Sequence, residues 1–507
     1  MSRPAATLAD PQVEHPMPWL TEAVPAAVAA VAGWDGERRR KAADGYVDAI
    51  ACGADVLWAD PQAARRADLG AEQVRDAIVH GLAILAHRPG GVTFAELHWH
   101  ANACPACPGA GRWALPPAPA GREARGAFFT PRALAAEIAH NAVGPHLVDQ
   151  EIMDIVGLQI ADIACGSGAF LVAVARLLHR THLELWTIGD ARYFVGLYDL
   201  PDEPYPLRGP FGPAVQAAAM MAAVDCVYGV DIDPLSVELT RLALALLLPD
   251  HDVTHTLRRQ VRCGDSLLGD GQPWWDGAAT SLMDTPGRFD WPTAFPEVFD
   301  HRDGLDRVGF DVVLGNPPYL GGKKLRGTLG EAYRQHLITN IAGGRRGSAD
   351  LAVYFWLRAH ELVCELGTVG IIGPANLMRG GNLRVWDDHL RQVAHRTLYR
   401  TEHGRRWPST SASISCCLLY SVMRRWIDPQ FRDHDPDDPG RAAHHTCDFG
   451  VDPPRFGETW QPRPGCPRCD ALAKAARLII RTEREGQAYE IVRHRTADST
   501  APEREHS

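Results

Sequence analysis

Short apolar runs alternate with longer amphipathic segments through the middle of the chain. The short runs are rich in β-branched residues and Leu, as is typical of buried strands, and the longer segments repeat apolar residues at helical spacing. This alternation predicts an α/β fold built around an open sheet. The predicted strands cover residues 158–162, 226–231, 261–265, 310–314, 368–373 and 412–422, and the predicted helices cover 134–147, 169–178, 235–248 and 351–366.

The strand predicted at residues 310–314 runs directly into a stiff polar tip. Asn316 is followed by Pro317, Pro318 and Tyr319. Proline cannot donate to a strand ladder and restricts the residue before it, so the strand must stop here. An amide, backbone carbonyls and an aromatic ring are therefore held at a strand's carboxyl end, where open α/β sheets bind ligands. A simple proline turn at the end of a core strand explains the same residues.

A glycine-rich turn follows the first predicted strand, which ends in Asp162. The chain turns on Gly166 and Gly168 into the helix predicted at 169–178. Glycine lets the backbone approach a ligand closely, and the start of a helix offers unpaired N–H groups. The loop lacks the third glycine of a dinucleotide-binding fingerprint, and an acid precedes it. Such an acid suits a ligand with an ammonium group better than one with a pyrophosphate.

Two further predicted strands also end in acids. Asp231 suits the acceptance of hydrogen bonds from ribose hydroxyls, and Asp265 suits an adenine amino group. Each acid taken alone could instead cap a helix. Because three acid-ended strands and the tip at Asn316 occur in this order, we predict one nucleoside pocket lined by the ends of the sheet.

Thr130 and Pro131 precede the amphipathic segment at 134–147. Thr is a favoured N-cap, and Pro is tolerated in the first helical turn. A capped helix start at Thr130 therefore explains both residues.

Length and composition predict a multidomain globular protein. The chain has 507 residues, of which 46% are hydrophobic and 22% charged, so two or three domains are expected. The formal net charge of −10 restricts any nucleic-acid contact to local basic patches, and the glycine-rich segments 321–326 and 343–347 are predicted to be basic loops. We expect an N-terminal helical region at 1–120, a catalytic domain at 121–426, and a short C-terminal extension with a disordered tail at 427–507.

Four potential metal ligands lie close together near the end of the N-terminal region. His98, His100, Cys104 and Cys107 have spacing that suits a structural, tetrahedral zinc site, and 466–469 offers a distant second cysteine pair. A pair of reduced thiols in a proline-rich connector is the alternative. The N-terminus shows no signal-peptide pattern, and the longest apolar run, 242–249, is far too short to cross a bilayer. We therefore expect a cytoplasmic protein with no membrane contact and no disulfides.

Taken together, these motifs resemble those of the N6-adenine-specific DNA methyltransferases of the gamma order. The matching segments are Phe-Phe-Thr-Pro at 128–131, the acid and glycine loop at 162–170, the acids at 231 and 265, and Asn-Pro-Pro-Tyr at 316–319. The flank at 291–299 is similar to stand-alone, restriction-linked and phage-defence methylases. The resemblance covers about residues 125–425. It implies a class I S-adenosylmethionine-dependent fold, which is Rossmann-like with a mostly parallel, seven-stranded sheet and helices on both faces.

The resemblance also implies a role for each motif residue. Double-stranded DNA would be the substrate, and a flipped-out adenine would be held by Asn316 and Pro317, with Pro318 fixing the tip. Tyr319 would stack on the target base, and Trp407 falls where the family places a second aromatic. The residues implied to bind S-adenosylmethionine are Thr130, Asp162, Ala164, Gly166, Gly168, Phe170, Asp231, Ile232 and Asp265.

Two departures from the family pattern bear on target choice. Fewer than about ninety residues follow the catalytic region, so sequence recognition is expected to need a partner subunit or the N-terminal helices. None of the four lysines has Glu two residues before it, which argues against a fused nuclease. The rival interpretations are an RNA or protein-glutamine methyltransferase, and a DNA-binding subunit of a modification complex.

Overall fold

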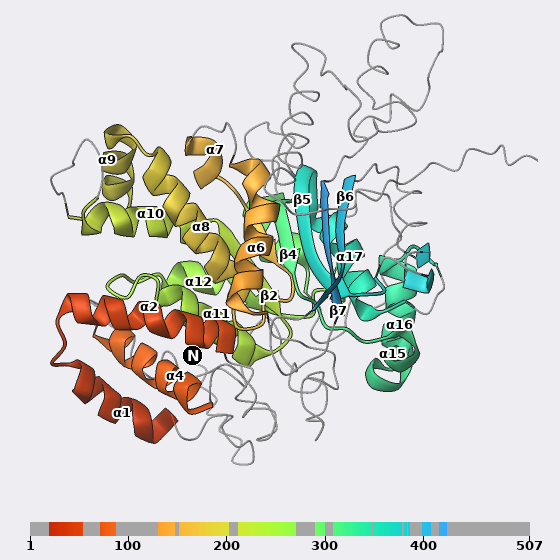
Figure 1. Cartoon of the computed structure of the whole chain (residues 1–507), viewed down its shortest axis with the longest axis horizontal. Helices are drawn as coiled ribbons and strands as arrows, with labels where there is room; N and C mark the ends of the chain where they lie inside the picture. The colour runs from red at the N-terminus through yellow and green to blue at the C-terminus, as the bar shows by residue number, and fades with distance from the viewer. Residues whose placement is uncertain are drawn as a thin grey trace, which may run out of the picture.

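The computed structural model shows an α/β body with an N-terminal group of helices against one side (Figure 1). The metal-ligand cluster at 98–107, the C-terminal extension at 427–507 and Trp407 lie outside the described residues. The described residues are 20–53, 71–87, 130–147, 152–201, 211–269, 289–299, 308–345, 349–377, 380–382, 384–385, 398–406 and 415–422.

Seven strands join in one sheet within the described part of the chain. The two central strands, at residues 160–162 and 310–315, are short and wholly buried, as expected for strands covered on both faces. The strands are β1 (Ile160–Asp162), β2 (Val227–Asp231), β3 (Val261–Cys263), β4 (Phe310–Gly315), β5 (Val363–Pro374), β6 (Leu398–Arg406) and β7 (Ser415–Val422).

The sheet has the order β3-β2-β1-β4-β5-β7-β6. The pairs from β3 to β5 are parallel, and β7 runs antiparallel to both β5 and β6. Because β1 and β4 are central neighbours, their carboxyl ends meet at one edge of the sheet. The prediction of a mostly parallel sheet with helices on both faces is confirmed.

One face of the sheet packs against a layer that includes α6, α8 and α11. Ile160, Val227 and Val312 point into the hydrophobic cluster on this face. Between α8 and β2, α9 and α10 form a small core of their own with Trp186. The helices from residue 132 to residue 260 are α6 (Arg132–Val143), η3 (Gly144–His146), α7 (Ile152–Val156), α8 (Ala169–Leu185), α9 (Ile188–Leu197), α10 (Pro213–Asp225), α11 (Pro234–Ala245) and α12 (Thr254–Gln260).

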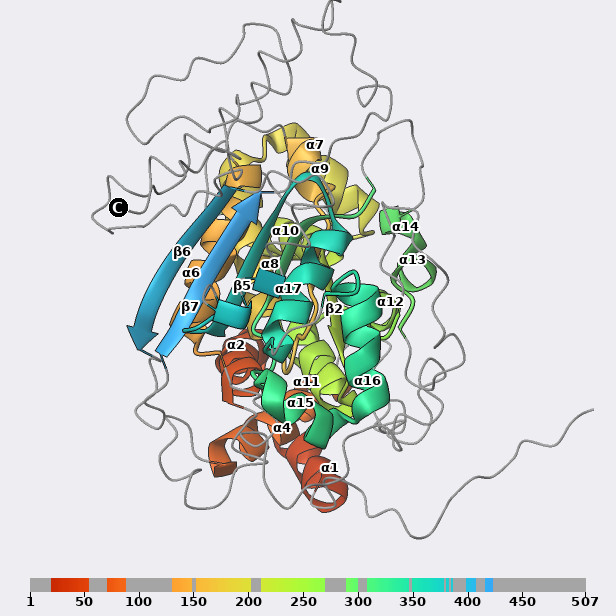
Figure 2. The same cartoon turned by 90° about the vertical axis from the view of Figure 1, so that its right-hand side faces the viewer.

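The opposite face is covered by α17 (Leu351–Leu362), which lies in front of the sheet in Figure 2. Aromatic residues that precede β4 pack in the hydrophobic cluster on the same face. Ala161, Tyr228 and Val313 point into this second cluster, as the alternation of side chains along a strand requires. Trp291 and Phe295 pack beside Phe310 within it. The helices on this side are α13 (Trp291–Ala294), α14 (Pro296–Phe299), α15 (Gly322–Leu329), α16 (Glu331–His336), η4 (Leu337–Ile341) and α17 (Leu351–Leu362).

The N-terminal helices pack onto the outside of α8 and α11. These helices are α1 (Leu20–Val31), α2 (Gly36–Gly53) and α4 (Ala71–Ala86). Val47, Ile50 and Ala51 of α2 are fully buried in the same hydrophobic cluster as α8 and α11. No helix in the described ranges is long and apolar enough to cross a membrane.

Several elements differ from the sequence prediction, and β6 was not predicted. The helix predicted at 351–366 ends at Leu362, because the following residues pair with β4 as the start of β5. The basic segment at 321–326 was predicted to be a loop, but most of it lies in α15, which buries Leu325. Helix α8 continues past residue 178 to Leu185.

Gly309, in the turn before β4, allows a test of how backbone strain and packing affect stability. Gly309 has φ +112°, and a Cβ there would lie 2.6 Å from the carbonyl oxygen of Leu362. We expect Gly309→Ala to lower the free energy of unfolding by roughly 2–4 kcal/mol, from backbone strain plus overpacking. Denaturant unfolding measures this change.

Gly330→Ala is the matched control for that variant. Gly330 also has positive φ, at +87°, but a Cβ there would meet nothing within 4 Å. It should therefore show the cost of backbone strain alone, about 1–2 kcal/mol. Equal effects of the two substitutions would contradict the role assigned to the contact with Leu362.

Candidate active site

The register of β1 and β4 brings the first strand-end acid beside the Asn-Pro-Pro-Tyr tip. Asp162 is paired with Leu314, two residues before Asn316. A Cβ added at Gly315 would lie 3.6 Å from Asp162 Oδ1. The acid expected to meet the cofactor and the amide expected to meet the acceptor are therefore neighbours at one edge of the sheet.

Asn316 lies at the centre of a short chain of hydrogen bonds. Its Nδ2 donates to Thr130 Oγ1 at 3.0 Å, and the Tyr319 hydroxyl donates to its Oδ1 at 2.7 Å. Asn316 and Thr130 are buried, and Tyr319 is half-buried. The two hydroxyls hold the plane of the amide from either end, so the side chain keeps little rotational freedom.

The prediction that Thr130 caps a helix is wrong. The N-cap position of α6 is Pro131, and no side chain caps this helix. The Thr130 hydroxyl accepts a hydrogen bond from Asn316, which lies 186 positions away in the sequence. A tertiary contact has replaced the local bond that the sequence pattern favoured.

The glycine turn after β1 is held open by backbone conformation and by one side chain. Gly166 and Gly168 have φ +54° and +96°, conformations that side chains with a Cβ rarely adopt. The Thr240 hydroxyl donates to the Gly166 carbonyl at 2.8 Å, and a Cβ at Gly168 would lie 3.1 Å from Thr240 Cγ2. At Gly166 a Cβ would meet no described atom within 4 Å, so that side of the loop is open as far as the described residues show.

Asp162 is fully buried without a compensating positive charge. Its Oδ1 accepts from the Ala164 N–H at 3.0 Å, whereas its Oδ2 has no hydrogen-bond partner in the part of the chain that the structure describes. Burial raises the pKa of this carboxyl to about 8, and the nearby charge of Asp231 also raises the pKa. A buried carboxylate oxygen without a donor is expected where a ligand supplies the missing group.

Asp231 holds the glycine loop in place. One oxygen accepts from the Gly166 N–H at 2.8 Å, and the other accepts from the Asp233 N–H at 2.9 Å. The next residue, Ile232, is 41% exposed, which is unusual for a large apolar side chain at a strand end. The second acid and this apolar surface thus lie immediately beside the loop.

Asp265 has a partner that the sequence did not reveal. The Tyr333 hydroxyl of α16 lies 2.9 Å from Oδ2 and 3.2 Å from Oδ1 and donates to the carboxylate, while Oδ1 accepts from the Leu267 N–H at 2.9 Å. Burial raises the pKa of the Asp265 carboxyl. Tyr333 is separated from Asp265 by 68 positions and belongs to no motif, so only the fold could identify it.

The remaining predicted site residues are placed as follows. Pro317 is buried and Pro318 half-buried behind Asn316, and Ala164 is half-buried in the loop. Phe170 is 2% exposed and packs in the hydrophobic cluster with α8 and α11, so it supports the loop from behind.

Two predicted sites are not covered by the structure. Trp407 lies outside the described residues, as do His98, His100, Cys104 and Cys107, so the zinc prediction is not tested. Among the residues that are described, no group of three or more His, Cys, Asp or Glu side chains suits a metal ion.

A family of known proteins matches the part of the chain that contains β2 to β5 and the Asn-Pro-Pro-Tyr tip. Residues 225–401 match the family described as Eco57I restriction-modification methylase. This span runs from the start of β2 into β6 and contains Asp231, Asp265 and the Asn-Pro-Pro-Tyr tip. The glycine loop and Thr130 precede it.

Two curated relatives point to the same class. The type II restriction enzyme and methyltransferase RM.Eco57I of Escherichia coli is 25% identical over 197 residues, 39% of this chain and 18% of that protein. The adenine-specific methyltransferase PglX of Streptomyces coelicolor is 26% identical over 227 residues, 43% of this chain and 16% of that protein. The chain thus spans less than a fifth of either relative. The family match and both relatives confirm the resemblance to adenine-specific methyltransferases of restriction-modification systems.

Among solved structures, this chain is similar to the type IIL restriction-modification enzyme MmeI in complex with DNA. It aligns with 59% of this chain and 38% of its own, at 18% identity and a TM-score of 0.34.

The burial of Asp162 predicts a pH-dependent stability. Its folded-state pKa, about 8, lies above the value of about 3.9 in an unfolded chain, so the folded state keeps a proton that the unfolded state loses. The folded protein therefore loses stability as pH rises from about 4 to about 8. We expect ligand-free Asp162→Asn to be more stable than wild type, by a gap that widens by roughly 2–4 kcal/mol between about pH 5 and about pH 8.

Denaturant unfolding at both pH values measures this gap. A gap independent of pH, or a variant less stable than wild type at the higher pH, would refute the proposed protonation of Asp162.

Proposed function

We propose that this chain is a site-specific DNA adenine N6-methyltransferase that uses S-adenosylmethionine, in a restriction-modification or phage-defence system. The observation that carries the proposal is the fixed Thr130–Asn316–Tyr319 chain of hydrogen bonds beside the partnerless oxygen of Asp162. It combines an acceptor for an amine with an acceptor for a cationic cofactor. The adenine-specific methyltransferase PglX among the relatives supports the choice of adenine.

The pocket residues fit S-adenosylmethionine. The Asp162 oxygen without a donor suits the ammonium of its methionine end, and the open side of Gly166 lets the ligand approach the backbone. Asp231 is assigned to the ribose hydroxyls, the exposed face of Ile232 to the adenine ring, and Asp265 to the adenine amino group. The cofactor supplies a methyl group made reactive by its sulfonium. These residues bind the cofactor and orient its methyl group. This positioning carries most of the rate enhancement in such a transfer.

Asn316 acts on the acceptor amine. The exocyclic nitrogen of adenine is a poor nucleophile because its lone pair is delocalised into the ring. Two N–H acceptors, the Asn316 side-chain carbonyl and the Pro317 backbone carbonyl, polarise that nitrogen and direct its lone pair toward the methyl group. Thr130 and Tyr319 hold the plane of the Asn316 amide before the base arrives, so little reorganisation remains at the moment of transfer.

The target base must leave the duplex to reach this tip, at a cost of roughly a few kcal/mol. Tyr319 is half-buried and contacts both hydrophobic clusters, so its ring is rigid enough to serve as a stacking surface. Trp407 is assigned as the second aromatic from the sequence alone. Selection of the DNA site is assigned to a partner subunit or to the N-terminal helices.

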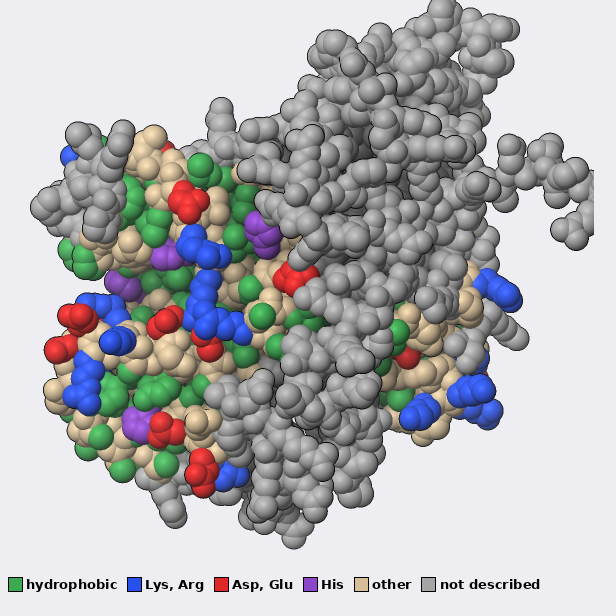
Figure 3. Space-filling model, in the orientation of Figure 1, with side chains coloured by type: hydrophobic (Ala, Val, Ile, Leu, Met, Phe, Trp, Pro, Cys, Tyr) green, Lys and Arg blue, Asp and Glu red, His purple; other side chains and the backbone are tan. Residues whose placement is uncertain are grey.

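A basic surface lies beside the tip and suits the DNA backbone. Helix α15 begins three residues after Tyr319, and its Lys323, Lys324 and Arg326 are exposed. Figure 3 shows Lys and Arg side chains gathered on the side of the molecule where α15 and α16 lie. Although the whole chain is acidic, this patch places positive charge where a flipped nucleotide's flanking phosphates would lie.

Asn316→Ala tests the transfer step. We expect S-adenosylmethionine affinity within about 2-fold of wild type, because the residue contacts the acceptor side, and at least about a 100-fold loss of kcat. Calorimetry with the cofactor and transfer of labelled methyl groups to DNA measure the two quantities. Asn316→Asp keeps an acceptor oxygen and should retain more activity than the alanine variant. Near-wild-type transfer by Asn316→Ala would refute the mechanism.

The acceptor itself is identified with the wild-type protein. Long-read mapping of DNA from cells that express it, with and without its genomic neighbours, should reveal N6-methyladenine at a defined sequence. Modified adenine only in the presence of the neighbours would establish the need for a partner. No modified adenine in either case would favour an RNA or protein acceptor.

The basic surface of α15 leads to a separate prediction about how DNA affinity depends on salt concentration. Replacing both Lys323 and Lys324 with Ala should weaken DNA binding and reduce the slope of log affinity against log salt by about 2, one unit for each lost phosphate contact. Cofactor affinity should not change. Replacement of Arg180 on α8 and Arg192 on α9, two exposed residues whose helices lie away from α15 in Figure 1, removes equal charge and is the control. Equal salt slopes for the two double variants would contradict this DNA contact.

A further inference from the structure

Helix α2 reaches the cofactor pocket from outside the sheet, although no sequence motif lies in it. The Ser167 hydroxyl, between the two glycines of the loop, donates to the Ala51 carbonyl of α2 at 3.0 Å. Both residues are buried, and Ala51 is fully so. The N-terminal helices therefore bear directly on the loop assigned to the cofactor.

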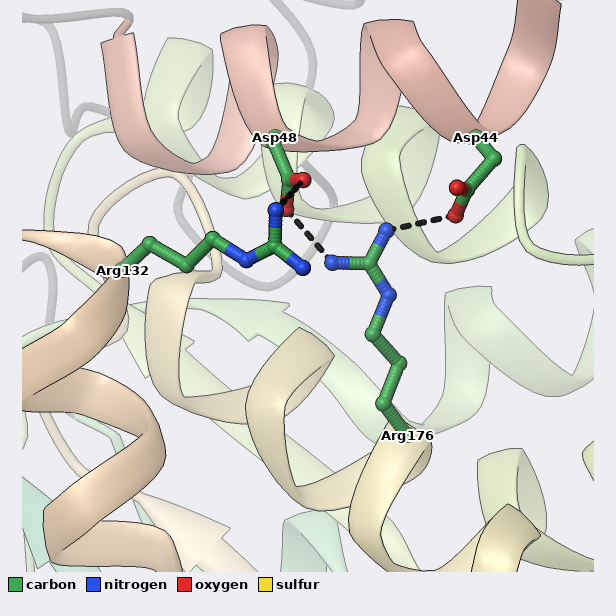
Figure 4. A network of polar contacts seen from close by, with 4 residues as sticks. All are labelled: Asp44, Asp48, Arg132 and Arg176. Carbon is green, nitrogen blue, oxygen red and sulfur yellow. Dashed lines mark hydrogen bonds and ion pairs between the residues drawn. The ribbon is translucent and has the colours of Figure 1, made fainter. Parts of the chain in front are cut away.

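One turn earlier on α2, Asp48 joins two elements that border the same pocket (Figure 4). Arg132 Nη1 donates to one Asp48 oxygen at 2.6 Å, and Arg176 Nη1 donates to the other. Arg132 opens α6, two residues after Thr130, whereas Arg176 lies about two turns along α8 from Gly168. Both arginines converge on a single carboxylate from opposite sides.

The two ion pairs of Asp48 connect α2 to the residues proposed to hold the acceptor base and the cofactor. Through Arg132 and the start of α6, Asp48 restrains Thr130, which accepts from the Asn316 amide. Through Arg176 and α8, it restrains the helix whose first turn follows the glycine loop. Asp44 also accepts from Arg176 at 2.7 Å, but it makes no bond to Arg132 and is 75% exposed. Asp48 is the carboxylate in this network that spans the two elements.

We propose that Asp48 is a positioning residue, which keeps Thr130 and the glycine loop in register so that the two halves of the pocket face one another. The assignment rests on the proposed function, because it takes Thr130 and the loop as parts of the methyl-transfer site. Partly exposed ion pairs contribute little to global stability, so the effect should appear in the geometry of the pocket rather than in unfolding.

Asp48→Asn in the full chain tests the proposal, since it keeps the shape of the side chain and removes its charge. We expect S-adenosylmethionine affinity about 5-fold weaker by calorimetry. Without cofactor, amide hydrogen exchange should be at least about 3-fold faster at residues 130–134 and 165–172. Asp48→Glu, which keeps the charge, should recover most of the affinity.

Arg40→Gln is the matched control. Arg40 also lies on α2 and forms an ion pair, at 2.8 Å, with Asp250 beyond the end of α11, away from the loop. It should leave cofactor affinity and exchange at the loop within about 2-fold of wild type. Arg132→Gln removes only the α6 half of the network and should reproduce the faster exchange at 130–134 alone.

The outcomes separate this inference from the proposed function. Cofactor binding by wild type with Asp48→Asn unchanged within about 2-fold would overturn the role of Asp48 and leave the proposed function standing. Equal weakening by Asp48→Asn and Arg40→Gln would also overturn it, because general docking of α2 would then explain the effect. If Asp48→Asn fails to fold, exchange in Arg132→Gln decides. Absence of cofactor binding by wild type would overturn both proposals.

Discussion

The buried carboxylate of Asp162 is the constraint on which the rest of the site depends. Sheet register places it between the Asn-Pro-Pro-Tyr tip and the glycine loop, and one of its oxygens has no donor among the described residues. Burial of such a group disfavours its charged form, so the ligand-free protein keeps the site at a cost to stability. Two large hydrophobic clusters on either face of the sheet offset this cost. A cationic ligand would relieve it, which links cofactor affinity to the same burial.

The acceptor side follows a different principle, since its groups are satisfied before any ligand arrives. Asn316 is oriented by Thr130 from the start of α6 and by Tyr319 from its own tip. A rigid amide loses little entropy and needs little reorganisation when an amine binds. The pocket thus combines one buried group with an unsatisfied oxygen, Asp162, and one side chain whose hydrogen bonds are already formed, Asn316. The unsatisfied group lies on the side proposed to recognise a charged ligand.

Much of this arrangement could be predicted from the sequence, because it depends on local chemistry. Each strand except β6, the three acids at strand ends and the proline-locked tip are encoded within a few neighbouring residues. Contacts between distant segments could not be predicted in the same way. Thr130 fits an N-cap by local rules, yet it bonds Asn316; Tyr333 carries no motif, yet it donates to Asp265. The boundary of α17 and β5 was misplaced because apolar residues suit both a buried helix and a buried strand.

The N-terminal helices show why such distant contacts bear on function. Their buried residues belong to the same cluster as α8 and α11, and Ser167 in the glycine loop donates to the carbonyl of Ala51. Coupling between two sites is reciprocal in free energy. If docked α2 strengthens cofactor binding through Asp48, then bound cofactor must strengthen the docking of α2 by the same factor. A region to which target selection is assigned would therefore respond to the state of the cofactor pocket, without any contact to the methyl group itself.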